Sequence, residues 1–372
     1  MQVAPLAAPF HLHPSLVLAR IISGVNVPLT YIFRITYAVL CLTAGLESVV
    51  WSSSFNFIPI DIPGATSTQA NGINDRGQIV GTFVDAGNQQ HGFLQDKRRF
   101  TTIDAPNLIG EGFSRTVGTT ADGINSRGDI VGNFSTFADR GEFEYGFLER
   151  KGAFSITAGG PLGIANPRDI NNRGQIVGNF FGAGAGGFLR DTNGKLTTIN
   201  VPGAGATSVF GINNRGDIVG AYGANRFAGN DHAFLLDKKG NLTTIDVPGA
   251  RFTQAFGIND AGVIVGGFTN VSCLNNICSS DTHGFLYNDG AFTTVDVPGA
   301  TFTTVTDINN AGLFVGLFRD ATGLHGFVDP PATVPEPTSF FLFGSGLAGL
   351  WAWRRRIVTT RRPCVKVCAG RG

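Results

Sequence analysis

The sequence predicts an all-β protein: a six-bladed β-propeller of six four-stranded repeats, each about 42–51 residues long, with an N-terminal signal segment and a C-terminal transmembrane helix. Two observations predict the repeat fold. A set of four short segments recurs six times in fixed order, and none of these segments has helical periodicity. The chain also holds 52 glycines and only 15% charged residues, a composition that favours turn-dense β structure over helices.

The four recurring segments define the repeat unit. In order they resemble FTTID, GIN, G-x-[IF]-V-G and HGFL. The FTTID-like segments begin at Phe57, Phe100, Phe154, Leu196, Leu242 and Phe292. The GIN-like segments end at Asn74, Asn125, Asn171, Asn213, Asn259 and Asn309, and the third segments end at Gly81, Gly132, Gly178, Gly220, Gly266 and Gly316. The HGFL-like segments begin at His91, Tyr145, Gly186, His232, His283 and His325. A period of about 40–50 residues indicates a solenoid or a propeller.

Each segment has a local physical interpretation. FTTID alternates apolar and β-branched polar residues, as a half-buried strand does. The VPGA that often follows places Pro and Gly at the centre of a type II turn. In GINxxGxIVG an Asn-x-x-Gly turn separates two short apolar strands, and its Gly can adopt positive φ. HGFL adds a short aromatic strand. One such sheet cannot bury both faces alone, so neighbouring units must stack as propeller blades, with a β-hairpin solenoid as the rival fold.

The repeat resembles the extracellular HAF-repeat family, which is named for a His-Ala-Phe triplet. That triplet stands at residues 232–234, and three other units contain HGF. The resemblance covers about residues 55–329. Two units depart from it, with Tyr145 and Gly186 in place of His. The resemblance implies a bacterial exported protein and no particular biochemical activity.

The segment before the repeats, residues 1–54, is predicted to direct export. Arg34 precedes an apolar run from Ile35 to Leu46 and then a small polar stretch, as in a signal peptide. The 33 residues ahead of Arg34 are long for such a segment, so the true start codon lies downstream or the segment stays as an uncleaved membrane helix.

The segment after the repeats has three parts. Residues 330–339 form a Pro-rich linker, residues 340–353 an apolar run predicted to be a transmembrane helix, and residues 354–372 a basic cytoplasmic tail. This order resembles the PEP-CTERM sorting signal, on the residues Val334, Pro335, Glu336, Pro337, Arg354, Arg355 and Arg356. The resemblance implies recognition by an exosortase, cleavage near the motif, and delivery to the cell surface or an extracellular polysaccharide matrix. Sixteen residues follow the arginines, where the family pattern usually ends.

Charge distribution argues against nucleic-acid binding by the repeats. The last 19 residues hold seven Lys or Arg and no acid, whereas residues 55–353 hold 19 basic and 26 acidic residues, a net charge of −7. A nucleic-acid-binding surface needs a basic patch, which this balance disfavours.

Candidate sites outside the sorting motif are few. The histidines that begin HGFL and the aspartates that end FTTID recur with the repeat, so we interpret both as structural and expect no metal site. We expect the aspartates to cap the turn that follows them. The acid cluster Asp139, Glu142 and Glu144 is interpreted as a solvated loop. Cys273 and Cys278 lie in one insertion, and an exported protein would form a disulfide between them.

The sequence therefore predicts an exported protein that is held in the inner membrane by its C-terminal helix and then sorted to the cell surface or beyond. Its expected role is structural or adhesive, with no catalysis and no cofactor, because no aperiodic catalytic constellation is present. Expected partners are an exosortase, the export machinery and extracellular polysaccharide. The alternative is a carbohydrate-binding or carbohydrate-active propeller that uses one end of the repeat domain.

Overall fold

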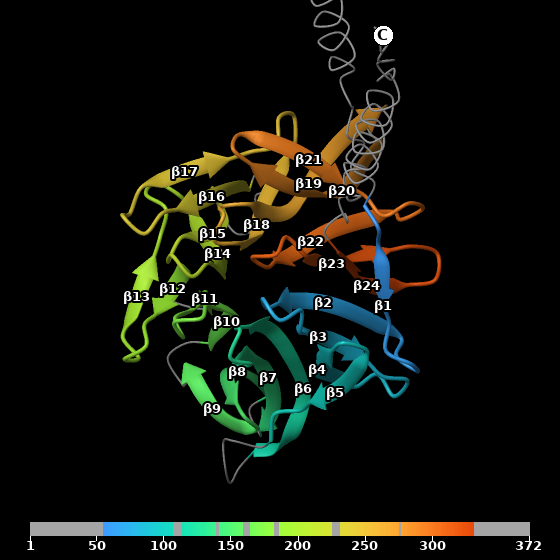
Figure 1. Ribbon diagram of the computed structural model, residues 1–372, viewed down its shortest axis with the longest axis vertical. Coiled ribbons are helices and arrows are strands. Elements are labelled where there is room, and N and C mark those ends of the chain that lie inside the picture. Colours follow the sequence, from blue (N-terminus) through green and yellow to red (C-terminus); the bar gives the residue numbers. More distant parts are fainter. Residues whose placement is uncertain are drawn as a thin grey trace, which may run out of the picture. The chain divides into compact units, whose positions relative to one another are not determined.

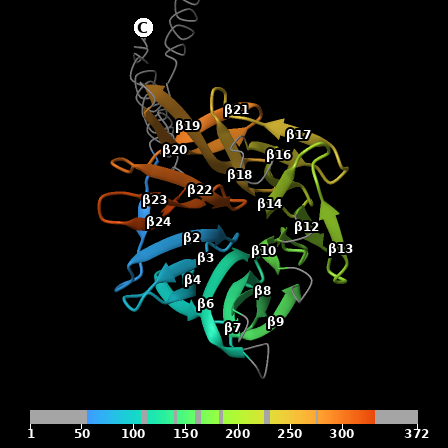
Figure 2. The ribbon, with the colours of Figure 1, turned by 180° about the vertical axis from the view of Figure 1, so that it is seen from behind.

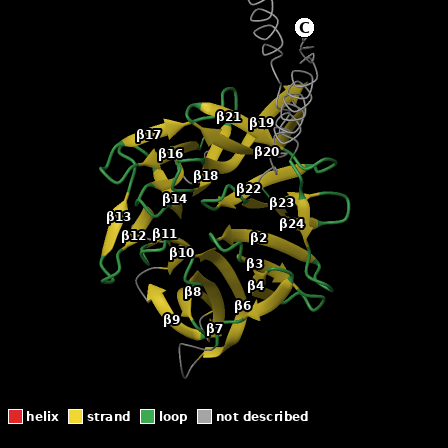
Figure 3. Cartoon of the chain, viewed as in Figure 1, coloured by secondary structure: helices red, strands yellow, loops and turns green. Residues whose placement is uncertain are grey.

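The computed structural model describes residues 55–106, 113–138, 141–158, 164–181, 186–224, 231–274 and 277–330. These residues form strands and connecting turns and no helix, which confirms the prediction of an all-β protein (Figure 1; Figure 3). None of them forms a helix long and apolar enough to cross a membrane. The predicted transmembrane segment, residues 340–353, lies outside the described residues.

The strands pair antiparallel in consecutive groups of four, each of which we call a blade, as the repeat pattern predicts. The innermost strands are β2 (Ser67–Ile73), β6 (Phe113–Ile124), β10 (Ile164–Ile170), β14 (Ala206–Ile212), β18 (Phe252–Ile258) and β22 (Phe302–Ile308). The second strands are β3 (Ile79–Val84), β7 (Ile130–Ala138), β11 (Ile176–Phe181), β15 (Ile218–Gly223), β19 (Ile264–Leu274) and β23 (Phe314–Arg319). The third strands are β4 (Gln90–Asp96), β8 (Gly141–Arg150), β12 (Gly186–Arg190), β16 (His232–Leu236), β20 (Ile277–Asn288) and β24 (Leu324–Asp329). The outer strands are β5 (Arg99–Ile103), β9 (Ala153–Ala158), β13 (Leu196–Ile199), β17 (Leu242–Ile245), β21 (Ala291–Val295) and β1 (Ile58–Ile60).

The last blade takes its outer strand from the other end of the described chain. β1 pairs antiparallel with β24, in the register Ile58 to Val328 and Ile60 to Gly326. The innermost strands contact one another in sequence, and β22 contacts β2. The blades therefore close into a β-propeller around a common axis, as the views from both sides show (Figure 1; Figure 2).

Both predicted turns form. In the VPGA turn at Val201, the amide of Ala204 donates to the Val201 carbonyl at 3.1 Å, and Gly203 has a φ of 80°. A positive φ at this third position defines a type II turn. In the Asn-x-x-Gly turn, the amide of Gly216 donates to the Asn213 carbonyl at 3.1 Å, and Gly216 has a φ of 92°.

Two positions recur in the core of every repeat. The phenylalanine of HGFL is 0% exposed in every repeat, at Phe93, Phe147, Phe188, Phe234, Phe285 and Phe327. The last Gly of the G-x-[IF]-V-G segment lies beneath this ring. A Cβ on Gly220 would stand 2.1 Å from the Ser208 carbonyl oxygen of the innermost strand and 2.7 Å from Cε1 of Phe234. The absent side chain is therefore what lets the phenylalanine pack onto the sheet.

Gly220→Ala is expected to destabilise the protein by roughly 1–3 kcal/mol, because the methyl group overpacks a site closed by backbone on one side and by a buried ring on the other. Chemical denaturation of the full chain would measure this free energy. The control is Ala206→Gly, which removes a half-buried methyl group at the start of β14 and creates no clash. Equal free energies of unfolding for Gly220→Ala and the wild type would contradict the close approach.

Candidate functional site

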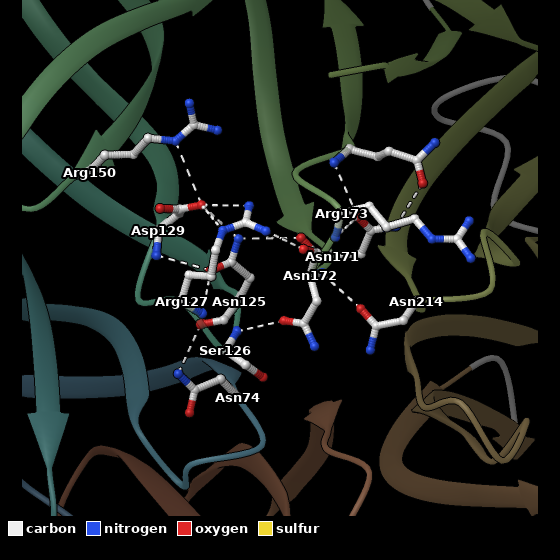
Figure 4. Close-up of polar contacts among 11 residues, drawn as sticks. Asn74, Asn125, Ser126, Arg127, Asp129, Arg150, Asn171, Asn172, Arg173 and Asn214 are labelled. Carbon is white, nitrogen blue, oxygen red and sulfur yellow. Dashed lines mark hydrogen bonds and ion pairs between the residues drawn. The ribbon is translucent and has the colours of Figure 1, made fainter. Parts of the chain in front are cut away.

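The side chains of the GIN asparagines form a ring around the axis, and we call this ring the asparagine collar. Figure 4 shows the part of it that contains Asn74, Asn125 and Asn171. In each repeat the GIN asparagine folds its own turn, as Asn213 does when its Oδ1 accepts the backbone amides of Arg215 and Asp217 at 3.0 and 2.9 Å. Its Nδ2 donates to the backbone carbonyl of the asparagine in the next repeat. These bonds run from Asn74 through Asn125, Asn171, Asn213, Asn259 and Asn309 back to Asn74, at 3.0–3.3 Å. The collar thus ties every described blade to its neighbour.

The residues after these asparagines form a second polar ring around the axis. Their side-chain oxygens accept the backbone amide of the equivalent residue in the preceding blade, as Asn172 accepts from Ser126 at 2.7 Å and Asn214 from Asn172 at 2.7 Å. Asp75 accepts from the Asn310 amide at 2.9 Å. Burial opposes ionisation of Asp75, but hydrogen bonds from Asn310, Ser126 and Asn172 outweigh it and lower its pKa. These side chains are bonded to one another, so we interpret the ring as structural.

An axial cavity of about 50 Å³ is lined by the residues of these two rings and by Asp169 and Asp307. Each carboxylate accepts two backbone amides. Asp169 accepts those of Ile170 and Ile212, at 2.6 and 2.8 Å, and Asp307 those of Ile308 and Ile73, both at 2.8 Å. Part of each side chain is accessible from the cavity, yet the surrounding strands desolvate both carboxylates. Burial raises the pKa of Asp169 to about 6 and that of Asp307 well above its usual value, to which repulsion from Asp169 contributes.

These raised pKa values predict a pH dependence of stability. A carboxyl whose pKa is higher in the folded than in the unfolded chain stabilises the fold fully below its unfolded pKa, and this stabilisation is lost as pH rises through the folded value of about 6. Asp169→Asn does not ionise, so its stability relative to the wild type should increase between pH 4 and pH 8. Urea denaturation across that range measures the difference. Asp289→Asn, at an exposed turn, is the control and should track the wild type. A difference between Asp169→Asn and wild type that does not change with pH would contradict the prediction.

A second cavity of about 240 Å³ lies on the axis next to the first, farther toward the starts of the innermost strands. We call it the axial chamber. Its lining includes one residue from the same repeat position of each innermost strand, two before the GIN isoleucine: Asn71, Asp122, Arg168, Phe210, Phe256 and Thr306. Thr304 and Leu317 complete the lining. The neighbouring isoleucine and asparagine are the same in all six repeats, whereas the residue at this position differs. The chamber is therefore lined by residues that vary between repeats.

The chamber has an aromatic side and a polar side. The rings of Phe210 and Phe256 are adjacent, with centroids 5.1 Å apart and planes inclined by 60°. From the polar side, Nη1 of Arg168 faces Oδ1 of Asp122 at 3.7 Å. Burial raises the pKa of Asp122, although Arg168 and hydrogen bonds from Thr120 and Asn133 oppose the rise. Two buried polar atoms of the lining, Nε of Arg168 and Oγ1 of Thr304, have no hydrogen-bond partner among the described residues.

The histidines that begin HGFL lie far from this axis, on the third strands, and each pairs with the aspartate that ends the outer strand. The Nδ1–carboxylate distances are 2.7–2.9 Å for His91–Asp104, His232–Asp246, His283–Asp296 and His325–Asp61. An aromatic ring of the second strand packs against each imidazole, as Phe318 does against His325 at 5.2 Å. The pairs therefore join the third and outer strands of four blades, and the His325–Asp61 pair joins β24 to β1. Within the described residues no three His, Cys, Asp or Glu side chains are placed to hold a metal ion.

The expected turn-capping role of these aspartates is wrong. The amide that follows them is capped by a threonine of the next innermost strand: the amide of Ile62 donates to Thr68 at 3.2 Å, and that of Val247 donates to Thr253 at 3.2 Å. The carboxylate is instead occupied by histidine, because the register of the third and outer strands brings the two side chains together.

Other sequence-predicted site residues are only partly placed. The sorting residues 334–337 and 354–356 lie outside the described residues, as do the signal segment and Asp139. Cys273 and Cys278 are direct partners in the register of β19 and β20, and the disulfide between them stays a prediction. Glu144 accepts a hydrogen bond from Asn166 at 3.1 Å and so joins the sheet rather than a free loop.

Solved structures with some similarity are distant. TolB from Acinetobacter baumannii aligns at 10% identity and a TM-score of 0.44, over 68% of this chain and 63% of TolB, which is less than two thirds of its length. YCF48 bound to D1 peptide aligns at 11% identity and a TM-score of 0.38, over 74% of this chain and 98% of that chain. Aleuria aurantia lectin in complex with Fucalpha1-6GlcNAc aligns at 11% identity and a TM-score of 0.35, over 73% and 98%. These likenesses assign no ligand or partner to this chain.

Comparison with curated proteins found no match. Comparison with known families found one, the PEP-CTERM protein-sorting motif, at residues 333–356. This range contains all the residues named above for the sorting signal, and the motif implies export and surface sorting. The HAF-repeat resemblance stays a prediction. The chain therefore joins a β-propeller of four-stranded repeats to a PEP-CTERM sorting motif.

Proposed function

We propose that this protein is exported, processed by an exosortase and displayed at the cell surface or in the extracellular matrix, where it has a structural or adhesive role and no catalysis of its own. The sorting motif at residues 333–356 is the observation that carries the proposal, because PEP-CTERM signals are processed by exosortases. In this view residues 1–54 direct export and residues 340–353 hold the protein in the inner membrane before sorting.

A six-bladed propeller suits such a role. The grouping of the strands and the collar of six asparagines support that blade count. Hydrogen bonds tie each blade to the next, and β1 covers the outer edge of β24, so the last blade also has four strands. Propellers of this kind leave only short, protected strand edges, which limits edge-to-edge aggregation.

Processing is tested by the intact mass and location of the protein in a host that has an exosortase. The expected product lacks the residues beyond about Pro337 and is found outside the inner membrane. The matched control replaces Pro335, Glu336 and Pro337 with alanine, which should leave the full-length chain in the inner membrane fraction. A wild-type chain that keeps its tail and stays in the inner membrane would overturn the sorting proposal.

The absence of catalysis is tested separately. The purified protein is incubated with a panel of extracellular polysaccharides, and reducing ends are assayed over time. We expect no turnover. Release of reducing ends that is lost in an Asp122→Asn variant would show an enzyme and overturn the proposal.

A second candidate function is carbohydrate binding through one end of the propeller. The axial chamber favours it, since aromatic rings and hydrogen-bonding groups meet there at a position where the repeats otherwise diverge. Ligand sites typically combine an apolar lining with a few placed polar groups, which is the composition of this chamber.

A further inference from the structure

We propose that the axial chamber binds a single sugar residue that carries a carboxylate, such as a uronic acid at the end of a polysaccharide, with Arg168 holding the carboxylate and Phe210 and Phe256 packing against the sugar ring. This inference rests on the second candidate function, carbohydrate binding at one end of the propeller. It adds the chemical class of the sugar and the residue that selects it.

The arrangement around the axis gives the chamber two unlike faces. Phe210 and Phe256 come from adjacent innermost strands, β14 and β18, and Asn71, Asp122 and Arg168 come from β2, β6 and β10. A pyranose has a similar division, because its C–H groups gather on the ring faces and its hydroxyls point outward at the rim. Aromatic side chains bury the apolar face while polar groups bind the rim.

The polar groups of the chamber have unused hydrogen-bonding capacity. Thr304 is 7% exposed, and its Oγ1 has no partner in the described part of the chain. Asn71 commits only its Nδ2, to Thr82 at 3.2 Å and to the Ala121 carbonyl at 3.0 Å. Its Oδ1 is left to accept from a hydroxyl. A buried polar atom without a partner costs free energy, so a ligand that supplies these bonds gains from them.

Arg168 supplies the selectivity for an acid. A guanidinium has five N–H donors, yet the described contacts of Arg168 amount to one ion pair of 3.7 Å with Asp122. Oδ2 of Asp122 already accepts from Thr120 at 2.9 Å and from Asn133 at 2.8 Å, so Asp122 is held by its own sheet rather than by the arginine. The guanidinium fork therefore stays available for bidentate binding of a carboxylate.

The charge balance favours a carboxylate over a phosphate. Arg168 is the one cationic side chain that lines the chamber, and Asp122 lies beside it. A phosphate dianion would place two negative charges against one positive charge and a neighbouring acid.

The size of the chamber limits the ligand to one residue. Its volume of about 240 Å³ is below the range of roughly 300–1,000 Å³ that holds a drug-sized ligand. The collar and its polar ring occupy the neighbouring stretch of the axis with side chains that are bonded to one another. We therefore expect a polysaccharide to enter with a chain end.

The test is isothermal titration calorimetry of the full chain, purified in detergent, with glucuronic acid, its neutral methyl ester, glucose and glucose 6-sulfate. The acid is expected to bind at least about tenfold more tightly than the ester, because only the acid can pair with the guanidinium. Arg168→Gln should remove this preference and leave the affinity for the ester unchanged. Phe210→Leu should weaken both ligands. Arg173→Gln, an exposed arginine at the collar end of the axis, is the control and should match the wild type.

Each other outcome overturns the inference in a distinguishable way. Equal binding of acid and ester, sensitive to Phe210→Leu, would leave carbohydrate binding standing and remove the acidic specificity. Tighter binding of the sulfate than of the acid would exclude carboxylate recognition. No binding of any sugar would overturn both this inference and the second candidate function, and would leave the export proposal intact. Thermal melts of each variant show that a lost preference does not reflect unfolding.

Discussion

Ile60→Ala is expected to destabilise the propeller by roughly 2–5 kcal/mol, because it opens a cavity where the ring closes. Ile60 is 2% exposed and packs in a cluster with Ile73, Phe93 and Val315, which come from both ends of the repeat region. It lies on β1, which is only three residues long, so few other contacts hold this strand in place. Thermal and urea denaturation of the full chain would measure the loss.

Ile58 provides the matched control on the same strand. It is 47% exposed, and its replacement by alanine removes little buried surface. Ile58→Ala should therefore unfold within about 0.5 kcal/mol of the wild type. If the two variants were equally stable, β1 would not contribute its buried face to the last blade, and the closure described above would be incorrect.

Asn213→Ala is expected to cost about 3 kcal/mol, because it leaves several buried backbone groups without partners. Asn213 is 3% exposed. The variant loses two acceptor bonds within its own turn, the bond of 3.1 Å to the Asn259 carbonyl, and a bond of 3.0 Å to Asp217. The loss falls on one turn and on one contact between blades, so unfolding should remain cooperative while its midpoint falls.

Two further variants separate these contributions. Asn193 is an exposed turn asparagine, and Asn193→Ala should leave stability unchanged. Asn213→Asp keeps an acceptor oxygen for the turn, but it loses the donor to the next blade and places a second carboxylate beside that of Asp217, so it should be less stable than the wild type. Equal stability of Asn213→Asp and the wild type would show that the collar bond contributes nothing.

The local structure of this protein follows from its sequence because short-range chemistry determines it. The alternation in FTTID, the positive φ of Gly203 and the Asn-x-x-Gly turns each depend on neighbours within a few residues. Strand type and turn type were therefore predictable. The collar was not, because the Nδ2 of each asparagine bonds to a residue 42–51 positions away, or 235 positions away where Asn309 bonds to Asn74, and no local pattern distinguishes that bond from a turn cap.

The histidine–aspartate pairs were within reach of sequence reasoning. In three of the four pairs the two residues are 13 or 14 positions apart on strands joined by a short turn, so counting the hairpin register brings them side by side. His325 and Asp61 are 264 positions apart and meet only where the ring closes. The axial chamber carried a different signal. The insertions are the obvious place to expect residues that break the repeat. The informative variation instead lies inside the repeat, two positions before the GIN isoleucine, where different repeats have Arg168, Phe210 or Asp122.

The pairing of β1 with β24 also determines when the protein can fold. The Asn56 amide bonds to the side chain of Asp329, 273 residues away, so the first strand must wait for the last before the ring can close. Pairings across such a separation form late and slowly. A chain that is exported with its N-terminus first therefore cannot close the ring until export is nearly complete. A chain that is truncated before β24 keeps an unpaired strand edge, which favours aggregation. The sorting motif begins at residue 333, directly after this last strand. Only a chain that is long enough to close the propeller therefore carries the motif that directs its sorting.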